Sequence, residues 1–234
     1  MSDAESGPRR RGQAQLIYEQ LHGAILARRL SPAAPLSQET LGRIFHAGPS
    51  SVRRALQRLA REGAVEMQPR RMACVAQPNA QRLRQLLGTR LLLEKDILRQ
   101  LAGRLDEQAR QELHGCIDAE LACLEGDDQA GLLGHAQRFH LRLAELTGSP
   151  LLPELLRQLL ERITLNIALG RGQPYTAEAC RQQRELLDAL AAGAAERACA
   201  CLEGYLGGID QRLRFAPPPT TDLHAAFAGK LAIP

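Results

Sequence analysis

The chain lacks several features that would each have assigned it to a particular class of protein. It has no run of about 20 apolar residues, so no segment is expected to span a membrane. Residues 1–12 are polar and have no apolar stretch after their arginines, unlike a secretory signal peptide. The chain has no P-loop, no nucleophile elbow and no Gly-x-Gly-x-x-Gly after an expected strand. We therefore expect a cytoplasmic protein that is not an enzyme.

Paired cysteines are also missing, because none of the six cysteines belongs to a Cys-x-x-Cys motif. In a cytoplasmic chain of this size we expect free thiols, most of them buried as small apolar residues. An alternative interpretation makes Cys180, Cys199 or Cys201 an oxidant sensor, since thiol reactivity depends on exposure and on pKa.

Lysine is absent from residues 1–80, and this part of the chain carries twelve arginines against six acidic residues. The rest carries 18 basic against 20 acidic residues, so the positive charge of the protein lies in its N-terminal third. Such asymmetry is typical of a polyanion-binding unit attached to a neutral one, because phosphate contacts supply much of the affinity for DNA.

Residues 36–75 contain the most informative pattern. Apolar residues recur at helical spacing on both sides of Ala47-Gly48-Pro49, which predicts helices over 38–45 and 49–62 that share one apolar seam. The outer faces carry arginines, among them Arg43, Arg53 and Arg54. Two short strands, at 64–67 and 72–75, are expected to follow as a wing with Arg70 and Arg71 at its tip. The pattern predicts a winged helix-turn-helix whose second helix can enter a major groove.

Further helices are expected over 14–29 and in six amphipathic segments downstream. The protein should therefore be mainly α, a winged helix-turn-helix domain followed by an all-α bundle of six to seven helices. The six downstream segments are 82–104, 106–125, 128–147, 150–170, 176–192 and 194–213. The expected domains are a disordered basic tail (1–12), the DNA-binding domain (13–78), the helical domain (82–214) and a Pro-rich tail (215–234).

Four segments in both halves of the chain resemble the GntR family of bacterial transcription regulators. Residues 47–56 (AGPSSVRRAL) are similar to the family's VSRTPVREAL, and residues 69–75 (PRRMACV) to its wing, PxRGAxV. Residues 90–94 (RLLLE) and 139–152 (FHLRLAELTGSPLL) resemble two segments of its FCD effector-binding domain. The resemblance covers about 14–213 and implies the FadR-like subfamily, whose members combine this domain with a winged helix-turn-helix.

The resemblance implies a DNA-binding role for particular residues of the recognition helix and the wing. In the family an arginine just after the helix cap and another four positions later contact DNA; here these positions hold Pro49 and Arg53. Losing one arginine removes about 1–3 kcal/mol of base discrimination, so an atypical operator is expected. The full expected set is Arg43, Ser50, Ser51, Arg53, Arg54, Arg70 and Arg71. Alternatively, Arg54, Arg58 and Arg61 form a solvated face that pairs with acids such as Glu62.

Many relatives bind a divalent metal in the helical domain through one aspartate and three histidines. The corresponding positions here hold Ala136, His140, Gln183 and Tyr205, so three of these four ligands are missing. We expect neither a metal nor another cofactor. The resemblance places His140, Gln183 and Tyr205 near an interior cavity together with Arg90 and Glu94, and Asn166 is a further candidate.

A buried arginine at that site would suit a carboxylate or phosphate, so the expected effector is a small, anionic organic molecule. Alternatively, these polar residues bond only to one another and bind no ligand. The resemblance further implies a homodimer on a palindromic DNA operator and a ligand-responsive repressor. The alternatives are the oxidant-sensing regulator and a partner-binding homologue without an operator.

Overall fold

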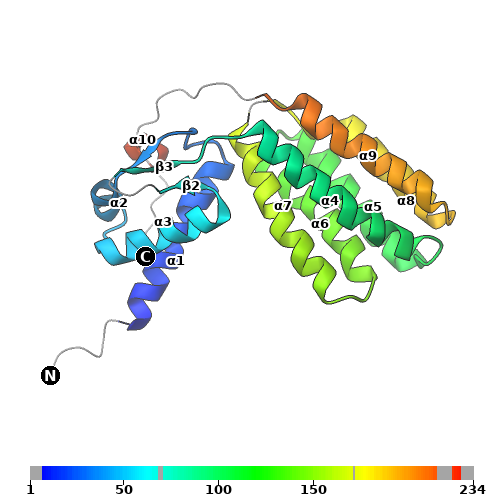
Figure 1. Ribbon diagram of the computed structural model, residues 1–234, viewed down its shortest axis with the longest axis horizontal. Coiled ribbons are helices and arrows are strands. Elements are labelled where there is room, and N and C mark those ends of the chain that lie inside the picture. The colour runs from blue at the N-terminus through cyan, green and yellow to red at the C-terminus, as the bar shows by residue number, and fades with distance from the viewer. Residues whose placement is uncertain (1–6, 68–70, 171, 215–222, 228–234) are drawn as a thin grey trace. The chain divides into compact units, whose positions relative to one another are not determined.

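The computed structural model describes residues 7–67, 71–170, 172–214 and 223–227. The chain divides into two compact units (Figure 1). One contains residues 1–78 together with 216–234, and the other is the all-helical segment Asn79–Phe215. The mainly α architecture, with a winged helix-turn-helix and a helical bundle, is confirmed.

The helix-turn-helix consists of α2 (Gln38–Ile44) and α3 (Pro49–Glu62). The hydroxyl of Ser37 caps α2 by accepting a hydrogen bond from the backbone N–H of Thr40. Pro49 occupies the first turn of α3, where its missing N–H costs nothing, and Gly63 ends the helix in the left-handed region. Both terminal roles agree with the expectation from the sequence. The buried face of α3 consists of Ser51, Val52, Ala55, Leu56 and Leu59.

Helix α1 (Gly7–Leu26) packs against α3 and begins earlier than expected. Its buried side chains include Ile17, Leu21 and Ile25. The expectation of a disordered tail over 1–12 is wrong for residues 7–12, which are helical, whereas residues 1–6 lie outside the described part of the chain. Arginine has a high helix propensity and a proline is tolerated in the first turn, so this basic segment can continue the helix toward its N-terminus.

A small antiparallel sheet completes this unit, in the strand order β1–β3–β2. Strands β2 (Val65–Glu66) and β3 (Ala73–Val75) form the expected wing, while its tip at 68–70 is not described. Strand β1 (Pro35–Leu36) was not expected, because two prolines suggested a plain break. It pairs along one side of β3, with Pro35 opposite Cys74, at the edge of the sheet, where proline is tolerated.

The C-terminal helix α10 (Leu223–Phe227) belongs to the winged-helix unit. A loosely ordered tail was expected there, and that expectation is wrong for 223–227. Phe227 is buried and meets Phe45 edge to face, with 5.3 Å between the ring centroids. The guanidinium of Arg29 donates a hydrogen bond to the backbone carbonyl of Ala226. The proline run at 217–219 favoured the prediction of a loose tail, because its composition gives no information about the apolar residues that follow it.

The second unit has six helices among its described residues, in close agreement with the six expected segments. They are α4 (Ala80–Leu101), α5 (Glu107–Glu125), α6 (Gln129–Leu146), α7 (Leu151–Leu169), α8 (Ala177–Ala191) and α9 (Ala195–Arg212). Helix α4 contacts α6, α7 and α9, and so lies at the centre of the packing. No helix in the described ranges is long and apolar enough to cross a bilayer.

The packing of α10 leads to a prediction. Replacing Phe227 with Ala removes a buried aromatic ring from its contact with Phe45, which should destabilise the winged-helix unit by about 3 kcal/mol. Amide hydrogen exchange near the end of α2 should become faster, while exchange in α4–α9 stays unchanged. The matched control is Met72→Ala, since that side chain is 59% exposed. Unchanged exchange around Phe45 in the Phe227→Ala variant would contradict this packing.

Candidate functional site

The exposed face of α3 is the first candidate site. Ser50, Arg53 and Arg54 are all exposed, while Val52 and Leu56 on the opposite face are fully buried. The same helix therefore packs into the unit on one face and presents guanidinium groups on the other. Ser51 does not fit the expected role, because it lies on the buried face and is only 1% exposed. Its hydroxyl is not accessible to a phosphate in this arrangement.

The remaining arginines of this unit differ in their surroundings. Arg58 contacts the unit itself: its guanidinium stacks on the ring of Tyr18 at 3.7 Å and donates to Gln15 and Glu62. This agrees with the alternative in which Arg58 pairs with Glu62. Arg43 is exposed and lies 3.8 Å from Glu39.

In the wing, Arg71 is exposed, and the neighbouring Arg70 lies outside the residues that the structure describes.

A buried polar cluster in the helical unit is the second candidate site. Arg90 and Glu94 lie one turn apart on α4, and the Nε of Arg90 donates to Glu94 Oε1 at 2.5 Å. The other carboxylate oxygen of Glu94 lies 2.6 Å from Nδ1 of His140, which comes from α6. All three side chains are at least 98% buried. The structure thus brings together three of the residues expected at the site.

Two tyrosine rings lie beside these residues. The ring of Tyr205, on α9, has its centroid 5.2 Å from that of His140 and 5.6 Å from the Cζ of Arg90. Tyr175, just before α8, lies 6.5 Å from Tyr205 between ring centroids. Burial raises the pKa of Tyr175 to about 12 and that of Tyr205 well above its usual value, so both phenols are neutral.

Gln183 on α8 joins the cluster through Glu120 on α5. The Nε2 group of Gln183 donates to Glu120 Oε1 at 3.0 Å, and both residues are buried. Burial raises the pKa of Glu120 to about 7, an effect that the hydrogen bond from Gln183 and the charge of Arg90 partly oppose. A substantial fraction of Glu120 therefore holds a proton at neutral pH.

Neither Glu120 nor Tyr175 was expected at this site from the sequence. A signal for Glu120 was present, since it continues the buried face of α5 formed by Leu113, Cys116 and Ile117. A glutamate at such a position is unusual, because carboxyl groups are rarely buried without a partner. Tyr175 had no comparable signal, because it lies in the connection between α7 and α8.

The ion pair determines the charge state of its members. Burial raises the pKa of Glu94, but Arg90 and His140 lower it more, to about 2. Burial and the charge of Arg90 lower the pKa of His140, despite the opposing effect of Glu94. At neutral pH, Glu94 is therefore ionised and His140 is neutral. The ionised carboxylate accepts from Nδ1–H of His140, which leaves the Nε2 of that ring with a free lone pair.

Five buried polar atoms of the cluster have no hydrogen-bond partner in the described chain. They are Arg90 Nη2, Glu120 Oε2, His140 Nε2, Gln183 Oε1 and Tyr205 OH. Most buried polar groups in proteins are hydrogen-bonded, and an unpaired one costs about 1–3 kcal/mol. Five such atoms on five neighbouring side chains indicate that other molecules, either water or a ligand, supply the missing partners.

Asn166 does not join this group. Its side chain is buried on α7, and Nδ2 donates to the backbone carbonyl of Arg162, one turn earlier in the same helix. No described contact links it to Arg90, His140 or Tyr205. Its burial is explained by this local hydrogen bond.

The positions at which the resemblance implies metal ligands offer few suitable donor atoms in this chain. Ala136 has no ligand atom, Gln183 offers only an amide, and Tyr205 is a neutral phenol. Of the four positions that the resemblance implies as metal ligands, His140 alone holds a histidine. Within the described ranges there is no group of three or more His, Cys, Asp or Glu side chains that could hold a metal ion.

The cysteines proposed as oxidant sensors lie in surroundings that disfavour the reactive thiolate. Burial raises the pKa of Cys180 to about 11 and also raises the pKa values of Cys199 and Cys201. Low-pKa, accessible thiols are the ones that oxidise readily. All six cysteines are free.

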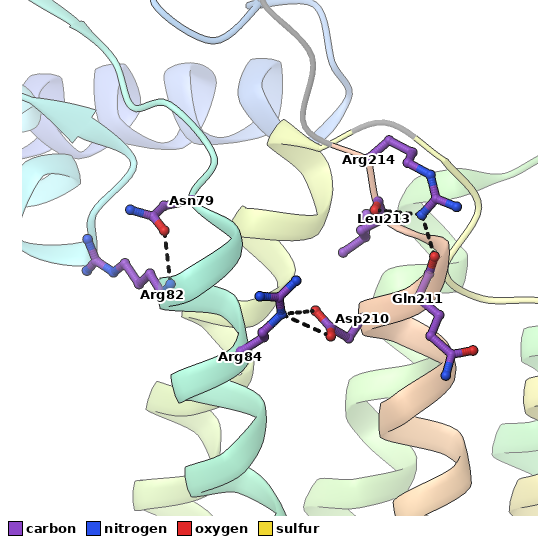
Figure 2. A network of polar contacts seen from close by, with 7 residues as sticks. All are labelled: Asn79, Arg82, Arg84, Asp210, Gln211, Leu213 and Arg214. Atoms are coloured by element: carbon purple, nitrogen blue, oxygen red, sulfur yellow. Dashed lines mark hydrogen bonds and ion pairs between the residues drawn. The ribbon is translucent and has the colours of Figure 1, made fainter.

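The two ends of the helical unit's chain are held side by side. Figure 2 shows Arg84, near the start of α4, reaching Asp210, near the end of α9, with Nε 3.3 and 3.2 Å from the two carboxylate oxygens. The side chain of Asn79 caps α4 by accepting from the N–H of Arg82. Since α4 carries Arg90 and Glu94 and α9 carries Tyr205, the cluster spans the two helices through which the chain enters and leaves this unit.

Comparison with known proteins identifies both parts of the chain. Residues 13–75 match the model of the bacterial regulatory proteins of the gntR family, and residues 85–208 match that of the FCD domain. A solved structure of a putative GntR regulator from Rhodococcus sp. RHA1 is similar, at 23% identity and a TM-score of 0.69 over 86% of this chain and 96% of that one.

Two further solved structures show the same fold. E. coli McbR/YncC has 21% identity and a TM-score of 0.63, covering 83% of this chain and 93% of its own. The structure titled as Lar, which controls the Listeria monocytogenes agr system, has 19% identity and a TM-score of 0.57, with 85% and 94% covered. No curated protein matches the sequence.

The raised pKa of Glu120 predicts a pH-dependent stability. The folded chain holds this proton up to about pH 7, whereas the unfolded chain loses it near the ordinary value of 4.5. Ionisation therefore opposes folding, and the wild type should lose stability relative to Glu120→Gln as pH rises from about 4.5 to 7. Urea unfolding at pH 5 and pH 8 measures the difference.

The matched control for this experiment is Glu161→Gln, an exposed position on α7 that should show no such change. The contribution of Glu94 has the opposite sign, because its lowered pKa stabilises the fold at neutral pH and this stability is lost as pH falls through about 4.5 to 2. That contribution cancels between wild type and variant. An equal stability difference at both pH values would contradict the assignment to Glu120.

Proposed function

The chain belongs to the GntR family of bacterial transcription regulators with an FCD effector-binding domain, and from this we propose that it is a ligand-responsive repressor of a palindromic operator. The observation that carries the proposal is the exposed arginine face of α3, a helix otherwise packed into its unit. The recognition helix of a helix-turn-helix enters the major groove and reads base edges with such side chains.

The proposed DNA-contacting residues are Arg43, Ser50, Arg53, Arg54, Arg70 and Arg71. Arg53 occupies the position of a family arginine that contacts DNA, and its exposure is compatible with that role. Pro49 replaces the other family arginine and supplies no hydrogen-bond donor. The operator should therefore differ from that of relatives at the base pair which that arginine would read.

We propose that the repressor acts as a homodimer. A palindromic operator presents two equivalent half-sites, which a protein with two-fold symmetry can occupy with two identical heads. Light scattering measures the mass of the protein alone and of its complex with a duplex that carries both half-sites. The two masses test the proposed stoichiometry.

The proposed effector site is the buried polar cluster of the helical unit. The five atoms without a partner support it, because they are gathered on neighbouring side chains of α4, α5, α6, α8 and α9. A metal plays no part in this proposal, since only His140 remains of the family's metal-binding histidines. The oxidant-sensing alternative has weaker support, because burial raises the pKa of each candidate thiol.

The signal is proposed to travel through α4 and α9. A ligand held between Arg90 and Tyr205 would interact with both helices, and the Arg84–Asp210 pair joins them where the chain enters and leaves the unit (Figure 2). Both segments continue along the chain into the winged-helix unit, which contains residues 1–78 and 216–234. A ligand that binds one spacing of α4 and α9 more tightly than another would shift the equilibrium between the two spacings. The size of the shift, and so of the effect on the DNA-binding units, is set by the difference in affinity.

Operator selection tests the DNA-binding half of the proposal. Genomic fragments flanking the gene are incubated with the full-length protein, and bound fragments are mapped by footprinting. We expect protection of an inverted repeat with half-sites about one helical turn apart. Binding without any sequence preference would contradict an operator-specific regulator.

The role of Arg53 leads to a separate prediction. Arg53→Ala should weaken operator binding by about 5- to 150-fold, which corresponds to the loss of about 1–3 kcal/mol expected for one bidentate base contact. Thermal unfolding should be unchanged, because the side chain is exposed. The matched control is Arg61→Ala, an exposed arginine near the other end of α3, for which affinity should change by less than about twofold. Equal losses in both variants would show general charge attraction rather than a specific contact.

A further inference from the structure

The buried cluster around Arg90 and Tyr205 has a hydrogen-bonding pattern that favours one class of ligand. Resting on the effector site proposed above, we propose that this ligand is an uncharged polyhydroxyl compound, a polyol or a sugar, and not a carboxylate or a phosphate. The proposal replaces the anionic effector that the sequence led us to expect.

The charges of the cluster leave no surplus of positive charge for a ligand anion. Among the described residues that form the cluster, Arg90 is the only cation, and its guanidinium is already paired with Glu94. The remaining oxygen of Glu94 is bonded to Nδ1 of His140. A ligand anion would therefore find no surplus of positive charge, and it would lie near the carboxyl groups of Glu94 and Glu120. Like charges repel strongly inside a protein, where the effective dielectric constant is low.

The atoms left without a partner include at least two hydrogen-bond acceptors. Gln183 uses its Nε2 for Glu120, so its unpaired atom is the acceptor Oε1. His140 uses Nδ1–H for Glu94, so its unpaired Nε2 is also an acceptor. Arg90 Nη2 is a donor, while Tyr205 OH can both donate and accept. Glu120 Oε2 accepts when ionised and donates when protonated.

These atoms require a partner that both donates and accepts at several positions. A hydroxyl group does both, so several hydroxyls on one small molecule can satisfy Gln183, His140, Tyr205 and Arg90 together. Carboxylate and phosphate oxygens, when fully ionised, only accept, and they leave Gln183 Oε1 and His140 Nε2 without donors. Unpaired buried atoms strongly reduce affinity, and this is how a hydrogen-bonding site discriminates between related ligands.

The experiment compares neutral and anionic molecules of the same skeleton. Isothermal titration calorimetry on the full-length protein uses three pairs of probes: glucitol and gluconate, ribitol and ribonate, and myo-inositol and its 1-phosphate. We expect the neutral member of at least one pair to bind at least tenfold more tightly than its anionic counterpart. The same neutral member should raise the thermal unfolding midpoint of the helical unit.

Variants locate the binding. Gln183→Leu and Tyr205→Phe should each weaken binding of the neutral probe about tenfold or more, because each removes an atom that the probe would satisfy. The matched control is Arg181→Gln, an exposed position on the same helix as Gln183, which should have no effect.

Two further variants test the charge argument. Glu94→Gln leaves Arg90 uncompensated and should shift the preference toward the anionic member. If that variant does not fold, Glu120→Gln serves instead, since it keeps the shape of the side chain. It should reduce the difference in affinity between the neutral and the anionic member of the pair.

The outcomes separate this inference from the proposed function. Tighter binding of an anionic probe, lost in Gln183→Leu, overturns the uncharged ligand but leaves the effector site in place. Failure of every probe to bind overturns the inference, and operator binding that depends on Arg53 would then still support the DNA-binding half of the proposed function. Preference for a neutral probe that is lost in Gln183→Leu supports both the site and the ligand class.

Discussion

The interior of the helical unit depends on the two contacts that the carboxylate of Glu94 makes. One of its oxygens holds Arg90 on the same helix, and the other holds His140 across the helix pair α4 and α6. Removing three buried polar side chains from water is costly, and the mutual pairing offsets much of that cost. The pairing also determines which atoms remain available: it occupies Nε of Arg90 and Nδ1 of His140, so that Nη2 and Nε2 are left without partners. The chemistry of the site therefore follows from a structural ion pair.

In the winged-helix unit, one face of α3 packs into the unit and the other face carries the side chains proposed to contact DNA. In α3 the apolar face joins α1, and Arg58 is held by Tyr18, Gln15 and Glu62. An arginine stacked in this way contributes to the unit through its stem and planar group as well as through its charge. All three arginines of this basic helix are exposed, but Arg58 is held by these contacts within the unit, which makes Arg53 the better candidate for DNA.

Much of the fold could be predicted because helical periodicity is a local property. The six helices of the second unit begin and end within a few residues of the segments expected from apolar spacing and from glycine and proline breaks. Three of the features that were missed depend on distant parts of the chain. Strand β1 exists because β3 offers an edge, and α10 forms where Phe227 meets Phe45. Glu120 is important because Gln183, more than sixty residues later, becomes its partner.

The sequence by itself determined the family, the order of the two domains and the helical segments. These follow from residue types at fixed spacings, which do not depend on how the chain is arranged in space. Only the tertiary structure decided which polar side chains share a buried site and which of their atoms remain unpaired. It placed Ser51 and Asn166 outside the sites expected for them, and it added Glu120 and Tyr175 to the buried cluster. Hydrogen-bond partners and charge balance are properties of side chains that meet in space, so spacing along the chain does not specify them.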